Sequence, residues 1–83
     1  MSEQGGDVKV LLEQVTKALV DAPDQVAVNQ VEEDGEITLE LTVAESDVGK
    51  VIGRSGRTAR ALRTLLGAAG IKAHKRYTLE ILE

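Results

Sequence analysis

The chain has 83 residues, with 10 Lys and Arg, 14 Asp and Glu, one His and no Cys. This length predicts one domain with a small core and argues against a multidomain enzyme. The lack of Cys excludes disulfides, Cys-based zinc sites and a thiol nucleophile, and a single His cannot complete a His-rich metal site. The chain shows neither an apolar run of the ~18 residues that a membrane-spanning helix needs nor the pattern of a signal peptide, so we expect a cytoplasmic protein.

The formal net charge of −4 conceals a division along the chain. Residues 1–48 hold 2 cations and 12 acids, a balance of −10, whereas residues 49–83 hold 8 cations and 2 acids, a balance of +6. Such a division indicates a polyanionic partner on one face, or else two halves that attract each other. Tyr77 is the only aromatic residue, which predicts an aliphatic core and argues against modules that stack bases on Phe or Tyr.

The N-terminal half predicts a helix followed by a hairpin. We expect residues 1–6 to form a disordered tail and Asp7 to cap the helix, which ends before Pro23. Alternating apolar side chains predict strands near residues 26–31 and 37–43, joined by a tight turn at Asp34-Gly35. Val31 interrupts the alternation and predicts a bulge. The inner stripe expected for the helix comprises Val8, Leu11, Leu12, Val15 and Leu19.

The C-terminal half predicts two helices and a third strand. Ser46 or Asp47 is a candidate N-cap for a short helix that ends at Gly53, and Gly70 is a candidate C-cap for the next helix. Residues 73–82 alternate as a strand, which a helical crossover would place parallel to one strand of the hairpin. The chain therefore predicts an α+β domain of order αββααβ, with a three-stranded sheet covered on one face by three helices. The inner face expected for the longer helix comprises Ala59, Leu62, Leu65, Leu66 and Ala69.

The most informative segment is residues 53–56, Gly-Arg-Ser-Gly, between the two helices. Glycines at both corners allow a sharp turn and the close approach of another backbone. The next helix begins there, so its free N–H groups and positive dipole end suit a phosphate oxygen. Arg54 and Arg57, followed by Arg60 and Arg63, add a curved band of positive charge. The glycine spacing excludes a Walker-type loop and a dinucleotide-binding fingerprint.

Residues 51–59, Val-Ile-Gly-Arg-Ser-Gly-Arg-Thr-Ala, resemble the GXXG signature of the KH domain, an RNA-binding module, and the predicted element order resembles its type II form. The resemblance covers residues 7–83 as one domain and is to the small stand-alone bacterial KH proteins of the KhpA type. It implies a non-catalytic protein whose GXXG loop clamps the phosphate backbone of about four nucleotides of single-stranded RNA. Either Val51 or Ile52 would form the aliphatic groove floor. The residues implied in RNA binding are Gly53, Arg54, Ser55, Gly56, Arg57, Lys50, Ile52, Arg60, Lys72 and Arg76, with His74 as a weaker candidate.

The resemblance also implies a biological setting. Such a protein would act as an RNA chaperone or post-transcriptional regulator connected with cell elongation and division. It would form a homodimer, or a heterodimer with a larger, Jag-like KH protein, and would need no metal, cofactor or small-molecule substrate. The alternative is a protein-interaction module with the KH fold and little RNA binding, which the acidic composition favours. Single-stranded DNA stays open as a ligand, whereas no nucleophile–base pair supports an enzyme.

Overall fold

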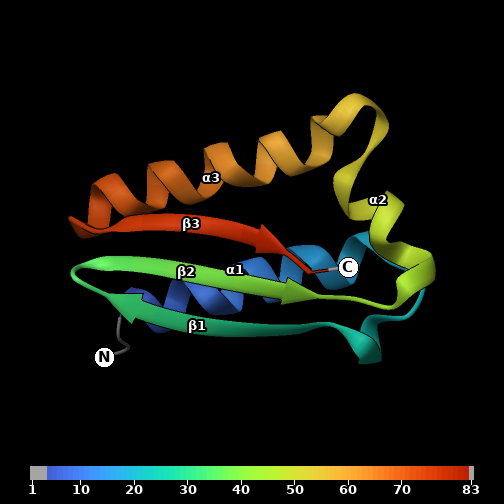
Figure 1. Cartoon of the computed structure of the whole chain (residues 1–83), viewed down its shortest axis with the longest axis horizontal. Helices are drawn as coiled ribbons and strands as arrows, with labels where there is room; N and C mark the ends of the chain where they lie inside the picture. Colours follow the sequence, from blue (N-terminus) through green and yellow to red (C-terminus); the bar gives the residue numbers. More distant parts are fainter. Residues whose placement is uncertain (1–3, 83) are drawn as a thin grey trace.

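The computed structural model describes residues 4–82, and their side chains from Val8 onward (Figure 1). These residues form a three-stranded sheet and three α-helices in the predicted order αββααβ, with one-turn 3-10 helices η1 (Pro23–Gln25), η2 (Glu45–Asp47) and η3 (Arg54–Gly56) in the connections. The fold class is therefore α+β, as the sequence predicts. The main elements are α1 (Gln4–Leu19), β1 (Ala27–Glu33), β2 (Glu36–Thr42), α2 (Val48–Ile52), α3 (Arg57–Ala73) and β3 (Arg76–Ile81).

The sheet has the order β1-β2-β3, with β1 antiparallel and β3 parallel to β2. The turn between β1 and β2 has φ of 54° at Asp34 and 81° at Gly35, the two positive values that a type I′ hairpin turn requires. Pairing is continuous from Ala27 opposite Thr42 to Glu33 opposite Glu36, so the bulge expected at Val31 is wrong. Val31 instead lies on the outer face of the sheet with 42% of its surface exposed.

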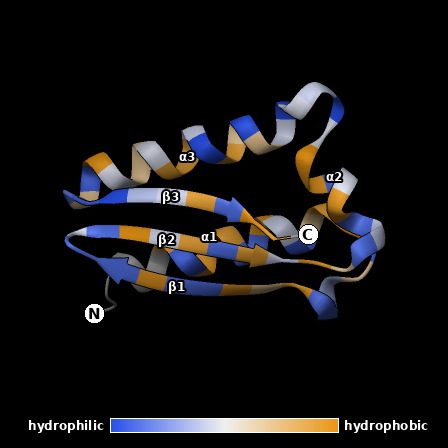
Figure 2. Ribbon diagram, viewed as in Figure 1, coloured by the Kyte–Doolittle hydropathy of each residue, from blue (hydrophilic) through white to orange (hydrophobic). Residues whose placement is uncertain are grey.

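The core lies between the inner face of the sheet and the helices, with α1 against β1 and α3 against β3 (Figure 1). The apolar side chains of β2, those of Ile37, Leu39 and Leu41, are completely buried. Figure 2 shows apolar and polar residues alternating along this strand. Each such side chain contributes about 1.5–3 kcal/mol to folding through its burial. The outer face carries the intervening polar residues of β2 and is not covered by a helix.

The first helix differs from the prediction at its start and in its buried stripe. It begins at Gln4, so Asp7 lies inside the helix and is not its N-cap, and of the expected tail only residues 1–3 fall outside the described residues. Leu11 and Leu19 are exposed by 39% and 41%, whereas Thr16 is fully buried. The helix contacts the sheet along a line with a spacing of four residues, which is narrower than the stripe expected from the sequence. This line consists of Val8, Leu12 and Thr16.

The third helix continues beyond Gly70, so the C-cap expected there is wrong. The left-handed residue is His74, with φ of 59°, and the N–H groups of His74 and Lys75 donate to the carbonyls of Ile71 at 3.3 Å and Gly70 at 2.8 Å. This pattern is a Schellman motif. Gly70 is required for packing instead, because a Cβ there would overlap the Lys75 carbonyl oxygen. Leu65, expected on the inner face, is 40% exposed.

Candidate nucleic-acid interface

The turn between α2 and α3 depends on its two glycines in different ways. Gly53 has φ of 78° and ψ of 169°, a conformation that is essentially restricted to glycine. A Cβ at Gly53 would also overlap the Thr58 side chain and lie 2.8 Å from the Thr58 nitrogen. Gly56 adopts a left-handed conformation with φ of 73°, and a Cβ there would meet nothing within 4 Å. The Gly56 N–H donates to the Gly53 carbonyl at 3.1 Å and closes the turn.

The tip of this turn carries the exposed residues Arg54 and Ser55. Ser55 has φ of 56°, which costs a non-glycine residue about 1–2 kcal/mol. Its carbonyl accepts a hydrogen bond from the Arg60 guanidinium at 3.4 Å, which ties the tip to the first turns of α3. Strained residues held by their surroundings concentrate at functional sites, and this one lies at the position expected to meet phosphate.

A groove of about 580 Å³ lies beside the turn, between the N-terminal half of α3 and the C-terminal end of β3. Its floor includes Ile52 and Ala59, and its α3 side carries two arginines. The lining residues are Ile52, Gly56, Ala59, Arg60, Arg63, Leu79, Glu80 and Ile81. The groove therefore combines an apolar floor with a basic wall, the arrangement that a single-stranded nucleic acid needs for its bases and its phosphates.

The structure resolves which of the two apolar residues before the turn faces the groove. Val51 is completely buried in the hydrophobic core. Ile52 is half-buried and lines the groove. Because the two residues are consecutive on a short helix, one points to the sheet and the other to the groove. Of the two candidates for the groove floor, the structure therefore places Ile52 there and Val51 in the core.

The arginines near the turn carry uncompensated charge. Arg54, Arg57, Arg60 and Arg63 are all exposed, and none of them forms an ion pair with a carboxylate in the part of the chain that the structure describes. Arg57 and Arg60 also border a second, shallow hollow on the outer side of α3. Four other cations are paired, those of Lys17, Lys50, Lys75 and Arg76. Lys9 and Lys72 also form no ion pair among the described residues, but the four arginines are the largest group of unpaired cations, and they lie together at the turn and along the first turns of α3.

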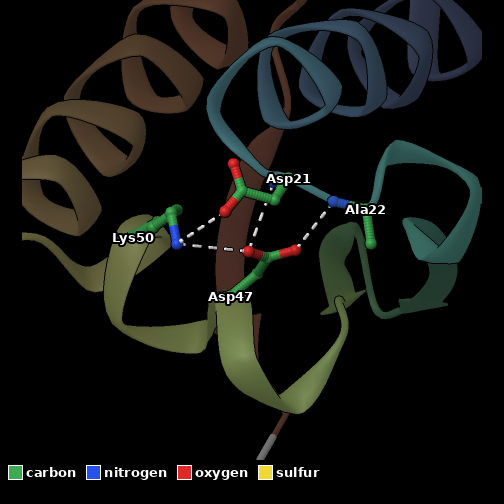
Figure 3. A network of polar contacts seen from close by, with 4 residues as sticks. All are labelled: Asp21, Ala22, Asp47 and Lys50. Atoms are coloured by element: carbon green, nitrogen blue, oxygen red, sulfur yellow. Dashed lines mark hydrogen bonds and ion pairs between the residues drawn. The ribbon is translucent and has the colours of Figure 1, made fainter.

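Lys50, expected to contact RNA, lies in a polar network away from the groove (Figure 3). Its ammonium is 3.2 Å from Asp21 Oδ2 and 3.5 Å from Asp47 Oδ1. The Asp47 carboxylate, which is 1% exposed, also accepts the N–H groups of Asp21 at 3.2 Å and Ala22 at 3.0 Å. Asp47 therefore occupies the N-cap position of α2, as predicted, but its side chain forms no capping hydrogen bond to that helix. The network joins α2 to the segment after α1.

The two charged groups of this network stabilise each other's ionised form. Burial raises the pKa of Asp47, but the N–H groups of Ala22 and Asp21, together with Lys50, outweigh it and hold the pKa below its usual value. The Asp21 carboxylate raises the pKa of Lys50 by more than burial lowers it, and Asp47 raises this pKa further. Both groups are therefore charged at neutral pH, and Lys50 connects α2 to the segment after α1.

Lys72 and Arg76, also expected in the RNA site, lie at the other end of α3 and β3. Lys72 is twelve residues beyond Arg60, which corresponds to about 18 Å along the helix axis. Arg76 begins β3 and lies 3.4 Å from Glu36 Oε2, and His74 before it forms the end of α3. The structure does not bring these residues to the groove. The strand residues that do border it, which sequence reasoning missed, are Leu79, Glu80 and Ile81.

Among residues 4–82, no helix is both long and apolar enough to pass through a membrane. In the same range, no group of three or more His, Cys, Asp or Glu residues is arranged to hold a metal ion.

Comparison with known proteins identifies the family of this chain. The family model described as KhpA/KhpB, KH domain, matches residues 9–81. A protein named RNA-binding protein KhpA from Borreliella burgdorferi is 51% identical over the full length of both chains. Proteins of the same name from Clostridium acetobutylicum and Aquifex aeolicus are 51% and 49% identical, over 90% and 92% of this chain and 100% and 96% of their own. With the matched region extending from α1 to the last residue of β3, this chain belongs to the KhpA/KhpB family of KH domains.

Proposed function

We propose that this protein binds single-stranded RNA, without catalysis, through the GXXG turn and the adjoining groove. The observation that carries the proposal is the set of four unpaired arginines around a turn whose shape is held by its backbone. The relatives in the Borreliella, Clostridium and Aquifex species are each named RNA-binding proteins, which supports the same ligand. A role as RNA chaperone or post-transcriptional regulator, connected with cell elongation and division, extends this proposal.

The binding mode follows from the charges and the shape of the site. A phosphate at the turn would meet the N–H groups at the start of α3, the positive end of the helix dipole, and the Arg54 guanidinium. Arg60 and Arg63 would hold the next phosphates along α3. The bases would then rest on Ile52 and Ala59, where apolar contact replaces the aromatic stacking that this chain cannot provide. Few contacts of this mode depend on base identity, so the sequence specificity of a single domain is modest.

A salt titration with a loop variant tests this function. Labelled RNA hexamers are titrated at several salt concentrations with wild type and with Arg54→Asp/Ser55→Asp, which lowers the charge by three. The matched control is Lys9→Asp/Gln25→Asp, which makes the same charge change outside the turn and groove. We expect wild type and control to bind with an affinity that falls as salt rises, and the loop variant to stay folded without binding. Equal affinity of the loop variant and the control contradicts the proposal.

Exposed apolar side chains on α3 favour a second function, contact with another KH protein. Ile71 is 79% exposed and Leu65 40%, on two flanks of the helix beside its buried face. The partner would be a second copy of this chain or a larger, Jag-like KH protein, and pairing of two sites would increase avidity for RNA. Sedimentation analysis of wild type and Leu65→Glu/Ile71→Glu tests the first partner. A dimer that dissociates in the variant supports it, and a monomeric wild type leaves only the larger protein as partner.

A further inference from the structure

The groove contains one carboxylate, that of Glu80, in a site that otherwise suits a polyanion. Among the lining residues Glu80 is the only acid, and it lies on the β3 side. The opposite side carries Arg60 and Arg63. A phosphate is attracted to one wall and repelled by the other, so a bound strand would place its backbone along α3 and its base edges along β3. Glu80 then lies against the bases and not against the phosphates.

The pairing of the sheet explains why the Glu80 side chain is available to a ligand. Glu80 lies directly beside Glu40 in the register of β2 and β3, and like charges in such a pair repel each other. The Glu40 carboxylate is bound to Asn29 Nδ2 at 3.0 Å, on the β1 side. Glu80 projects from the outer face of the sheet, as Glu40 does. Because β3 is an edge strand, the space left to its side chain lies over the free edge, where Glu80 borders the groove. Glu80 also forms no ion pair among residues 8–82.

We propose that Glu80 determines base specificity in the groove by selecting bases that carry an exocyclic amino group, an inference that rests on the proposed RNA binding. An ionised carboxylate only accepts hydrogen bonds. Cytosine, adenine and guanine each offer an amino group to it, and carboxylates accept from the cytosine amino group in known recognition pairs. Uracil offers one N–H flanked by two carbonyl oxygens, which the carboxylate repels. The groove therefore disfavours uracil at the nucleotide beside β3.

Cytosine and uracil make the sharpest comparison, because they have the same size and differ at the amino position. Wild type, Glu80→Gln and Glu40→Gln are titrated with labelled oligo(C) and oligo(U) hexamers at one salt concentration. Glu40→Gln is the matched control, since it makes the same charge change on the neighbouring strand but outside the groove lining. A charge-assisted hydrogen bond to one base corresponds to a preference of about tenfold. We expect wild type and Glu40→Gln to prefer oligo(C) by this factor.

The glutamine variant gives the decisive result. The glutamine amide both donates and accepts hydrogen bonds, so it can bind uracil as well as cytosine. We therefore expect the affinities of Glu80→Gln for oligo(C) and oligo(U) to differ by no more than about twofold. The inference is overturned if wild type binds both oligomers equally, if Glu80→Gln keeps the wild-type ratio, or if Glu40→Gln loses it as well. A wild type that binds neither oligomer instead contradicts the proposed RNA binding itself. The two failures are thus distinguishable in one experiment.

Discussion

Alanine substitutions at the two glycines of the turn should have unequal effects on stability. At Gly56 the cost is the left-handed backbone alone, about 1–2 kcal/mol, because a Cβ there has no neighbour within 4 Å. At Gly53 the backbone conformation costs about 1–3 kcal/mol. The overlap of the new Cβ with Thr58 adds a displacement of α3, and overpacking of this kind costs about 1–3 kcal/mol more. Gly53→Ala should therefore lose about 4 kcal/mol, more than twice the loss at Gly56.

Thermal and urea unfolding followed by far-ultraviolet circular dichroism measure this difference, since the chain has no Trp. For a domain of this size each kcal/mol lowers Tm by about 4–8 °C. Gly56→Ala should lose about 5–10 °C and Gly53→Ala about 20 °C. Thr58→Ala should recover part of the loss at Gly53 and none at Gly56, because it removes the hydroxyl with which the new Cβ overlaps. Equal losses at the two glycines, or no coupling with Thr58, would refute this reasoning.

Three other predictions follow from buried or paired polar groups. The Thr16 hydroxyl is buried and has no hydrogen-bond partner among the described residues, so Thr16→Val should raise the free energy of unfolding, measured in urea, by about 1 kcal/mol. A lower free energy of unfolding in the variant would contradict the unpaired state of this hydroxyl. Arg57→Gln should reduce the slope of log K against log salt for RNA by about 0.7, whereas Lys50→Gln should lower Tm and leave the slope unchanged. The pKa of Asp47 is lower in the folded chain than the value of about 3.9 expected when unfolded, so the stability it supplies is complete above that value and is lost as pH falls below it. Acid unfolding of Asp47→Asn should consequently depend less steeply on pH than that of wild type, and identical pH profiles would contradict this role.

The parts of the fold that the sequence predicted correctly depend on local signals. Asp34-Gly35 suits only a few turn types, and the alternation along β2 identifies its buried face without any knowledge of its neighbours. Gly53 and Gly56 occupy backbone conformations that few other residues adopt, so the position of the turn was evident as well. These features involve residues close together in the chain, which explains why no tertiary information was needed.

The errors concern features that depend on how elements meet. A helical pattern shows which side of α3 is apolar, but it does not show that the sheet covers too little of it to bury Leu65. The RNA contacts expected at Lys72 and Arg76 stay predictions, but the structure places both residues away from the groove, for a reason that lies in the topology. Because β3 returns alongside α3 in the opposite direction, the strand residues nearest the turn are those at its C-terminal end. The first turns of α3 therefore lie beside the end of β3, and this antiparallel arrangement would have indicated Glu80 as a residue that borders the groove.

The geometry also resolves the conflict between an acidic chain and an RNA ligand. The acidic hairpin tip around Asp34 lies at one end of β2 and the GXXG turn at the other (Figure 1). β2 has seven residues, which corresponds to about 23 Å, or about three Debye lengths at physiological ionic strength. The tip carboxylates of Glu32 and Glu36 are in addition paired with Lys75 and Arg76. The acidic hairpin tip therefore contributes little to the potential at the turn, and this part of the negative charge behind the sequence pI of 5.0 gives no reason to prefer a protein-interaction module over RNA binding.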